Sequence, residues 1–332
     1  MVGTRHLAAA AAAAALAFAG VSGAARADMP PGIVDIYTNL GYQGSAAAGT
    51  GIILTSTGEV LTNNHVIRGA TTVKATVVDT GRTYKAKVLG YALGQDVAVI
   101  QLQNASGLPV APVGSSTGIH VGDTVTAFGN AGGRGGTPSS AAGTIRALGK
   151  SITATDDSGT TERLTGLIVT DADLQPGDSG GPLVDTGGHV IGMDTAAGST
   201  FTFESSSSRG YAIPIDKARS IAAQIVAGRA ITGIHIGATA FMGVSVRDTG
   251  DFSGGGNGVI VADIVPGSPI ARAGISPGDV LTGFDGKTVD SSNRLTSLVA
   301  TKSPGDTVKI RWLDALGGAH TASITLASGP PQ

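Results

Sequence analysis

Hydrophobic and polar residues alternate over short distances between residues 51 and 102. Runs rich in Val, Ile and Thr recur there, and turns that contain Gly separate them. The runs fall at 51–55, 59–62, 72–78, 83–89 and 97–102. Short strands separated by Gly-containing turns are typical of an antiparallel barrel. This part of the chain is therefore predicted to form one barrel.

A second group of short apolar runs follows further along the chain. The runs fall at 142–148, 166–171, 182–184, 190–194 and 211–213, and they predict a second barrel. Segments 130–140 and 196–209 are rich in Gly or Ser and are predicted to be loops. The spacing of apolar residues changes at 215–227. There they recur at helical intervals, which predicts a helix with one apolar face that ends before Gly228.

One short motif carries the strongest chemical signal. It is Gly177-Asp178-Ser179-Gly180-Gly181-Pro182. Its glycines allow a tight path in which the N–H groups of Gly177 and Ser179 both point beside the Ser179 hydroxyl. Two such donors would stabilise a carbonyl oxygen that becomes negative during attack. A flexible surface turn is the plain alternative, because the chain has 52 Gly, but the complete hexapeptide favours a nucleophile.

A serine nucleophile needs a base, and the base needs a group that orients it. His65 is the candidate base, because it follows a predicted strand at the start of a short turn. Asp96 is the candidate orienting group. It begins the apolar run 97–102, where a buried carboxylate needs a partner. Asp79 and Asp123 are rivals, but both lie in turn-like settings that indicate capping.

These motifs resemble those of the HtrA family of trypsin-like serine proteases, and most closely its secreted PepA-type branch from mycobacteria. The resemblance rests on segments 62–67, 95–99, 175–182 and 210–214. It implies a mainly β fold, with a chymotrypsin-like pair of six-stranded β-barrels followed by a small α+β PDZ domain. It also implies that His65, Asp96 and Ser179 meet in the cleft between the barrels.

Residues 241–330 resemble a bacterial PDZ domain. Phe241-Met242-Gly243-Val244 is a hydrophobic turn whose backbone N–H groups could hold a peptide C-terminal carboxylate. The peptide would add as a strand beside 244–247, and a predicted helix at 293–301 would form the other wall. In the alternative interpretation, Phe241 and Met242 are ordinary core or linker residues.

The chain divides into four predicted parts. Residues 1–27 form a signal peptide, 28–229 the protease domain, 230–240 a linker and 241–330 the PDZ domain. The first part has a short basic start, an Ala-rich apolar stretch and Ala25-Arg26-Ala27 before the cleavage point. A retained membrane anchor is the alternative, but the stretch is short and weakly apolar. The expected location is therefore outside the cell or in the envelope or periplasm.

Composition narrows the set of partners and cofactors. The net charge is −2 and only 14% of residues are charged, which does not favour a nucleic-acid partner. The chain has no Cys, so no disulfide is expected, and the absence of closely spaced His pairs argues against zinc. No cofactor or metal is expected. The family often forms trimers, so a homotrimer is one option for the oligomeric state.

Two acidic residues near the nucleophile have open roles. Asp173 lies where trypsins place the Asp that selects Lys or Arg, whereas HtrA-type proteases usually have a small residue there and cut after small aliphatic residues. The favoured interpretation turns Asp173 to solvent and lets Leu174 line the specificity pocket. Asp178 replaces the Asn of many HtrA-type proteins and is expected to be solvated or paired with an Arg.

The resulting hypothesis is a secreted serine endopeptidase that acts on unfolded or exposed protein segments, with a PDZ domain that binds peptide C-termini. A second hypothesis is a chaperone or peptide-binding scaffold with a resting protease site. A third, an esterase of another fold, is disfavoured because the order His65, Asp96, Ser179 is that of chymotrypsin.

Overall fold

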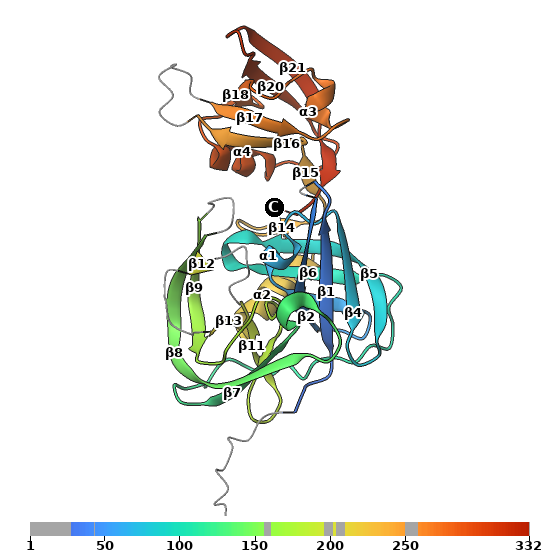
Figure 1. The fold of residues 1–332 in the computed structure, drawn as a ribbon, viewed down its shortest axis with the longest axis vertical. Coiled ribbons are helices and arrows are strands. Elements are labelled where there is room, and N and C mark those ends of the chain that lie inside the picture. The colour runs from blue at the N-terminus through green and yellow to red at the C-terminus, as the bar shows by residue number, and fades with distance from the viewer. Residues whose placement is uncertain are drawn as a thin grey trace, which may run out of the picture.

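A computed structural model gives the fold of the chain (Figure 1). It describes residues 28–42, 44–155, 161–195, 202–203, 210–249 and 258–331. The predicted signal peptide and most of the predicted loop 196–209 lie outside these residues. Within the described ranges, no helix has the length and apolar character needed to cross a bilayer.

The first barrel is a closed sheet of six antiparallel strands. Its strands are β1 (Ile33–Leu40), β2 (Ser45–Ile53), β3 (Glu59–Thr62), β4 (Thr72–Val77), β5 (Arg82–Ala92) and β6 (Val97–Leu102). Pairing of β5 with β6 closes the sheet. The short helix α1 (Asn64–Ile67) follows β3, and the 3-10 turn η1 (Leu93–Gln95) precedes β6. Two catalytic candidates, His65 and Asp96, therefore lie at the ends of neighbouring strands β3 and β6.

The second barrel is built in the same way. Its strands are β7 (Thr124–Gly129), β8 (Ser139–Thr155), β9 (Thr161–Thr170), β10 (Pro182–Val184), β11 (Val190–Asp194) and β13 (Gly210–Pro214). Pairing of β8 with β9 closes it, and β12 (Thr202–Phe203) adds to β8. The 3-10 turn η2 (Ala131–Gly133) lies between β7 and β8. Motif 177–182, which carries the candidate nucleophile, ends at the first residue of β10.

The predicted fold class is confirmed, and several strand bounds were predicted to the residue. Helix α2 (Ile215–Val226) also lies where the apolar spacing placed it, with Ile215, Ala218, Ala222 and Ile225 buried. Strands β1 and β7 were not predicted. In β1 the apolar run is interrupted by polar residues, and two of them, Asp35 and Thr38, are nevertheless buried. Burial of polar side chains depends on partners elsewhere in the chain, which hydrophobic periodicity does not report.

The third unit is a smaller α+β domain above the barrels in Figure 1. Its sheet contains β16 (Val244–Asp248), β17 (Val259–Ile264), β18 (Val280–Phe284), β19 (Lys287–Thr288), β20 (Thr307–Leu313) and β21 (Ala319–Thr325). Helices α3 (Pro269–Arg272) and α4 (Ser292–Val299) accompany the sheet, and β15 (Thr239–Phe241) pairs with β22 (Ala327–Gly329). Met242, Phe284 and Trp312 are buried in the core of this unit.

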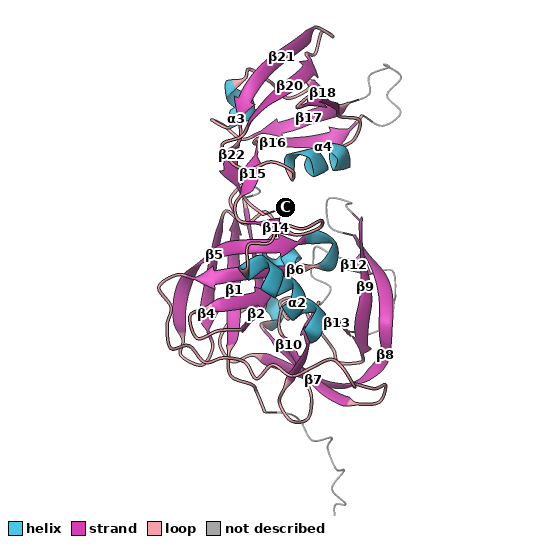
Figure 2. Cartoon of the chain, turned by 180° about the vertical axis from the view of Figure 1, so that it is seen from behind, coloured by secondary structure: helices cyan, strands magenta, loops and turns pink. Residues whose placement is uncertain are grey.

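The segment between the barrels and this unit takes part in regular structure. Strand β14 (His235–Ile236), within the predicted linker 230–240, pairs with β5 of the first barrel (Figure 2). Tyr91 and Thr239 also share a hydroxyl hydrogen bond of 3.2 Å. The connection is therefore held against the first barrel, while the boundaries between the four predicted parts of the chain stay predictions.

Candidate active site

His65 and Asp96 are in direct contact. The two oxygens of the Asp96 carboxylate lie 3.1 and 2.9 Å from His65 Nδ1, and Oδ1 also accepts the backbone N–H of His65 at 3.0 Å. Asp96 has a left-handed backbone (φ 53°), which Asp tolerates better than most residues. The carboxylate therefore holds both the ring and the backbone of the histidine, and this fixes Nδ1 as the protonated nitrogen.

Asp96 has a further partner that was not predicted. The hydroxyl of Thr195, just after β11, donates to Asp96 Oδ2 at 2.9 Å. The side-chain amide of Asn63 donates to the backbone oxygen of Asp96 at the same distance. Thr195 comes from the second barrel and Asp96 from the first, so this contact also joins the barrels. No spacing rule connects residues so far apart in the chain, and the sequence carries no signal for it.

Ser179 lies at the junction of the two barrels. It is 3% exposed, and its backbone oxygen accepts the N–H of Thr50 in β2 at 2.8 Å. A Cβ atom at Gly49 would lie 3.3 Å from the same oxygen and 2.7 Å from Val66, the residue after His65. The backbone of Ser179 and the helix that carries His65 thus approach the same residue of β2.

Gly177 has a conformation and surroundings that only glycine accepts. Its φ is 102°, and a Cβ atom there would lie 2.1 Å from the backbone oxygen of Asn130. The carbonyl of the preceding residue, Pro176, accepts the N–H of Gly132 at 2.7 Å. In a trans peptide the N–H and C=O point in opposite directions. The hydrogen bond to Pro176 therefore also sets the direction of the Gly177 N–H.

Asp178 lies in an environment that the sequence did not predict. It is 4% exposed, and its carboxylate accepts the Ser139 hydroxyl and the Gln175 N–H, both at 2.8 Å. Neither the solvated nor the Arg-paired environment is found in the described part of the chain. Burial raises the pKa of Asp178, and the two hydrogen bonds oppose that rise. Ser139 belongs to β8, so the spacing of residues around Asp178 could not reveal this partner.

Asp173 and Leu174 occupy different environments. Asp173 is exposed, and its carboxylate accepts the side-chain amide of Gln175 at 2.9 Å. Leu174 is partly buried and packs against the apolar core of the second barrel. A Cβ atom at Gly210 would lie 2.8 Å from Leu174 Cδ1, so this side chain borders β13. The apolar side chain, and not the carboxylate, thus faces the barrel.

Asp194, at the end of β11, is a further buried carboxylate near the candidate nucleophile Ser179. It is 0% exposed, and neither side-chain oxygen has a hydrogen-bond partner among the described residues. The backbone of Asp194 makes two hydrogen bonds to the residues that follow Ser179. Its oxygen accepts the N–H of Gly180, and its N–H donates to the oxygen of Gly181, both at 2.8 Å. Burial raises the pKa of Asp194 well above its usual range, and the nearby charge of Asp178 raises it further.

Because the pKa of Asp194 is higher in the folded than in the unfolded chain, its contribution to stability is greatest at acidic pH. That contribution declines as the pH rises above about 4, the value for an unfolded Asp, toward the folded-state pKa. We expect Asp194→Asn to raise the free energy of unfolding at pH 8, with little gain at pH 4, because each unit by which folding raises the pKa of Asp194 costs about 1.4 kcal/mol once the pH exceeds the folded-state pKa. Urea unfolding followed by far-UV circular dichroism measures the difference.

The same unfolding experiment contains an internal control. Trp312 is the only Trp in the chain and lies in the third unit, so its fluorescence should report a transition that Asp194→Asn leaves unchanged. A substitution of the exposed Asp290 by Asn alters the net charge equally and should shift neither transition. Equal stabilisation by Asp194→Asn at both pH values would contradict the argument.

The predicted carboxylate loop of the third unit is an ordered turn. Met242 is buried, and the backbone oxygens of Met242 and Gly243 accept the N–H groups of Ile270 and Val265. Strand β16 follows the loop and lies at the edge of its sheet. At the far end of β16, Asp248 accepts the N–H of Ser292 at 2.6 Å, where α4 begins. Phe241 stacks on Tyr42 of the first barrel, with ring centroids 5.0 Å apart.

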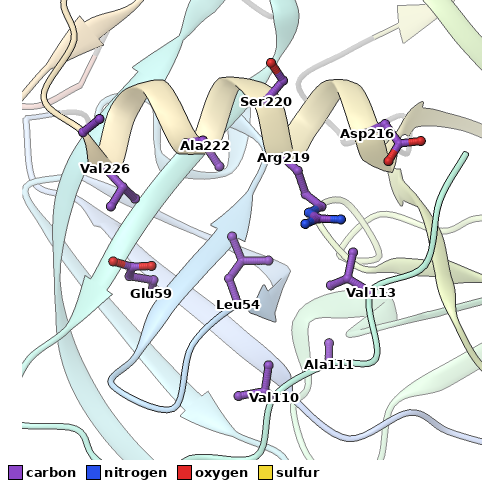
Figure 3. Close-up of a pocket in the computed structure, with 12 residues that line it drawn as sticks. Leu54, Glu59, Val110, Ala111, Val113, Asp216, Arg219, Ser220, Ala222 and Val226 are labelled. Carbon is purple, nitrogen blue, oxygen red and sulfur yellow. The ribbon is translucent and has the colours of Figure 1, made fainter.

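A separate groove lies along helix α2 (Figure 3). Leu54, Val110, Val113, Ala222 and Val226 form its apolar lining, with Glu59, Asp216 and Arg219 among its polar residues. None of the candidate catalytic residues borders it. Among the described residues, no group of three or more His, Asp or Glu side chains is placed to hold a metal ion.

Comparison with known proteins identifies the family. A model of the trypsin-like peptidase domain matches residues 49–193, and a PDZ domain model matches residues 240–313. The putative serine protease HhoA of Synechocystis sp. is 35% identical over 291 residues, which cover 85% of this chain and 70% of HhoA. The chain belongs to the HtrA family of trypsin-like serine proteases with a PDZ domain.

Other relatives of this HtrA-family chain agree with that assignment. Serine protease PepD of Mycobacterium tuberculosis is 33% identical over 314 residues, which cover 90% of this chain and 64% of PepD. The chain thus spans about two thirds of the length of these relatives. A solved structure of the HtrA-type protease AlgW with a tripeptide is 29% identical, with a TM-score of 0.51, covering 92% of this chain and 96% of AlgW.

Proposed function

We propose that this HtrA-family chain is a serine endopeptidase that hydrolyses peptide bonds in unfolded or exposed protein segments. Its catalytic residues are His65, Asp96 and Ser179, and its oxyanion donors are the N–H groups of Gly177 and Ser179. The observation that carries the proposal is the doubly anchored His65–Asp96 pair, with Nδ1 at 2.9 Å from Oδ2. A histidine held in this way presents its other ring nitrogen as a base.

The reaction proceeds through an acyl-enzyme. Ser179 Oγ attacks the scissile carbonyl carbon, and its proton passes to His65 Nε2. The carbonyl oxygen becomes negative and is held by the two backbone donors. His65 then gives the proton to the departing amine nitrogen as the C–N bond breaks. Water attacks the ester in the same manner, His65 takes the water proton, and its return to Ser179 Oγ releases the acid.

Asp96 stabilises the positive charge that His65 carries after each proton transfer. The carboxylate accepts hydrogen bonds from the His65 backbone, the His65 ring and the Thr195 hydroxyl, so both of its oxygens have donor partners. Because Asp96 is 2% exposed, the attraction between the imidazolium and the carboxylate is weakly screened. The transition state with charged His65 is favoured accordingly.

The specificity pocket is proposed to be apolar and lined by Leu174. Asp173 is exposed and already hydrogen-bonded to Gln175, so it is not directed at a bound side chain. A basic residue before the scissile bond would find no buried carboxylate from Asp173. An apolar pocket favours an apolar side chain at that position, and the resemblance to HtrA-type proteases implies a small one, such as Val or Ala.

We expect a peptide with Val before the scissile bond to be cleaved with a kcat/KM at least about tenfold higher than the same peptide with Arg, because apolar pockets discriminate by about 1–3 kcal/mol. Cleavage rates are measured on two peptides that differ only in this residue. Casein digestion serves as a general test of protease activity. Asp173→Ala is the control and should leave the ratio unchanged. Preference for Arg that disappears in Asp173→Ala would overturn the specificity, and a protein that cleaves neither peptide nor casein would overturn the function.

The PDZ domain is proposed to bind peptide C-termini. The turn Phe241, Met242, Gly243 and Val244 would hold the terminal carboxylate, and the open edge of β16 would accept the peptide as an added strand. Protein and peptide substrates are the proposed partners, with a homotrimer as the proposed assembly. Activity outside the cell or in the envelope follows if residues 1–27 act as a signal peptide.

A further inference from the structure

Thr50 in β2 is fully buried at the junction of the two barrels and makes four hydrogen bonds there. Its hydroxyl donates to the backbone oxygen of Gly177 at 2.7 Å and accepts the N–H of Asn130 at 2.9 Å. Its backbone N–H donates to Ser179, and its backbone oxygen accepts the Thr62 hydroxyl. One side chain from the first barrel thus contacts the loop that carries both proposed oxyanion donors.

The two bonds of the Thr50 hydroxyl act on opposite sides of Gly177. The first fixes the peptide plane that follows Gly177, because it holds the Gly177 carbonyl. The second anchors Asn130, at the start of turn η2, and within that turn the N–H of Gly132 holds the Pro176 carbonyl at 2.7 Å. That carbonyl belongs to the peptide plane that precedes Gly177 and contains its N–H.

We propose that Thr50 is a positioning residue for the oxyanion hole, and that its hydroxyl keeps the Gly177 N–H aimed at the reacting carbonyl oxygen. The inference rests on the proposed function, because it assigns Gly177 and Ser179 as oxyanion donors. Without the hydroxyl, the peptide planes on both sides of Gly177 lose a restraint. A glycine offers little resistance of its own to rotation of these planes.

The expected consequence is a selective loss of transition-state binding. A misplacement of about 1 Å in a catalytic group costs about a hundredfold in rate, and loss of one oxyanion donor costs about a hundredfold to a thousandfold. Thr50→Val keeps the branched shape and removes the hydroxyl. We expect it to lower kcat by about tenfold to a hundredfold and to leave KM within about twofold, because the substrate binds before the oxyanion forms.

A peptide aldehyde distinguishes positioning from a general structural role. Its hemiacetal oxygen with Ser179 occupies the oxyanion hole, so its inhibition constant should rise by the same factor as kcat falls. Binding of the uncleaved peptide, measured in Ser179→Ala with and without Thr50→Val, should stay within about twofold. Thr50→Ser keeps the hydroxyl and should restore kcat to within about threefold of the unmodified enzyme.

Thr38→Val is the matched control. Thr38 is also a buried Thr of the first barrel, and its hydroxyl donates to the backbone oxygen of Ala47 at 3.3 Å, so its loss removes a buried hydroxyl away from the loop. Thr50→Ala is a second variant in case Val prevents folding. The inference is overturned if the unmodified enzyme is active and a folded Thr50→Val or Thr50→Ala variant keeps the same kcat and the same affinity for the aldehyde. An inert unmodified enzyme would instead overturn the proposed function, and the inference with it.

Discussion

Ser179→Ala is expected to lower kcat on casein by about four orders of magnitude or more, since no other group can form the acyl bond. The change should leave the fold intact. It removes only the hydroxyl, and the bond from the Thr50 N–H to the Ser179 backbone oxygen does not involve the side chain. Casein digestion and circular dichroism of the purified protein measure the two effects.

A covalent probe gives an independent measurement on the same residue. A fluorophosphonate should label the unmodified protein at Ser179, and the label should be absent from Ser179→Ala. This result also separates the endopeptidase from the scaffold hypothesis, since a resting site would not react. Undiminished casein digestion by Ser179→Ala would refute the assignment of the nucleophile.

Asp96→Asn is expected to lower kcat by about four orders of magnitude near neutral pH. Asp96 accepts hydrogen bonds from three donors, namely the His65 backbone N–H, the His65 ring and the Thr195 hydroxyl. An Asn side chain has one oxygen, and its NH₂ group would face a donor. The imidazole then favours the tautomer with its proton on Nε2, which cannot accept the proton of Ser179.

The substitution is suited to this test because it does not strain the backbone. Asn tolerates the left-handed conformation that Asp96 adopts, so a loss of activity reports the hydrogen bonds. Asp79→Asn and Asp123→Asn are the controls, because the sequence offers both as rival orienting groups. In the structure their carboxylates accept the N–H groups of Gly32 and His120. A similar loss of kcat in either control would contradict the assignment of Asp96.

The choice among the three carboxylates shows what local sequence can predict. An Asp that begins a continuous apolar run must be buried with a partner, and the structure supplies His65 as that partner of Asp96. Motif 177–182 and the bounds of β3, β6, β10 and β11 were predicted for the same reason, since each depends on neighbouring residues alone. The catalytic roles of these residues stay a proposal.

Other features depended on residues that are distant in the chain. The environment of Asp178 was predicted wrongly because its partner Ser139 comes from β8. Asp194 resembles an ordinary strand-end residue in the sequence, and only the packing around β11 shows that both of its oxygens are enclosed without partners among the described residues. Asp173 is exposed in the structure, while the role of Leu174 in specificity stays a proposal. The distance of Asp173 from the candidate nucleophile in the sequence pointed to the opposite role, and the family resemblance outweighed it.

The amino-acid sequence alone determined the family, the mainly β class and the candidate nucleophile, because these follow from short motifs and from the period of apolar residues. The tertiary structure alone decided which side chains hold those groups in place. Thr50 and Gly177 are 127 residues apart, and Thr195 and Asp96 are 99 apart, yet each pair shares a hydrogen bond. Closure of two barrels against each other creates these contacts, and no local pattern of residues encodes which hydroxyl will meet which oxygen.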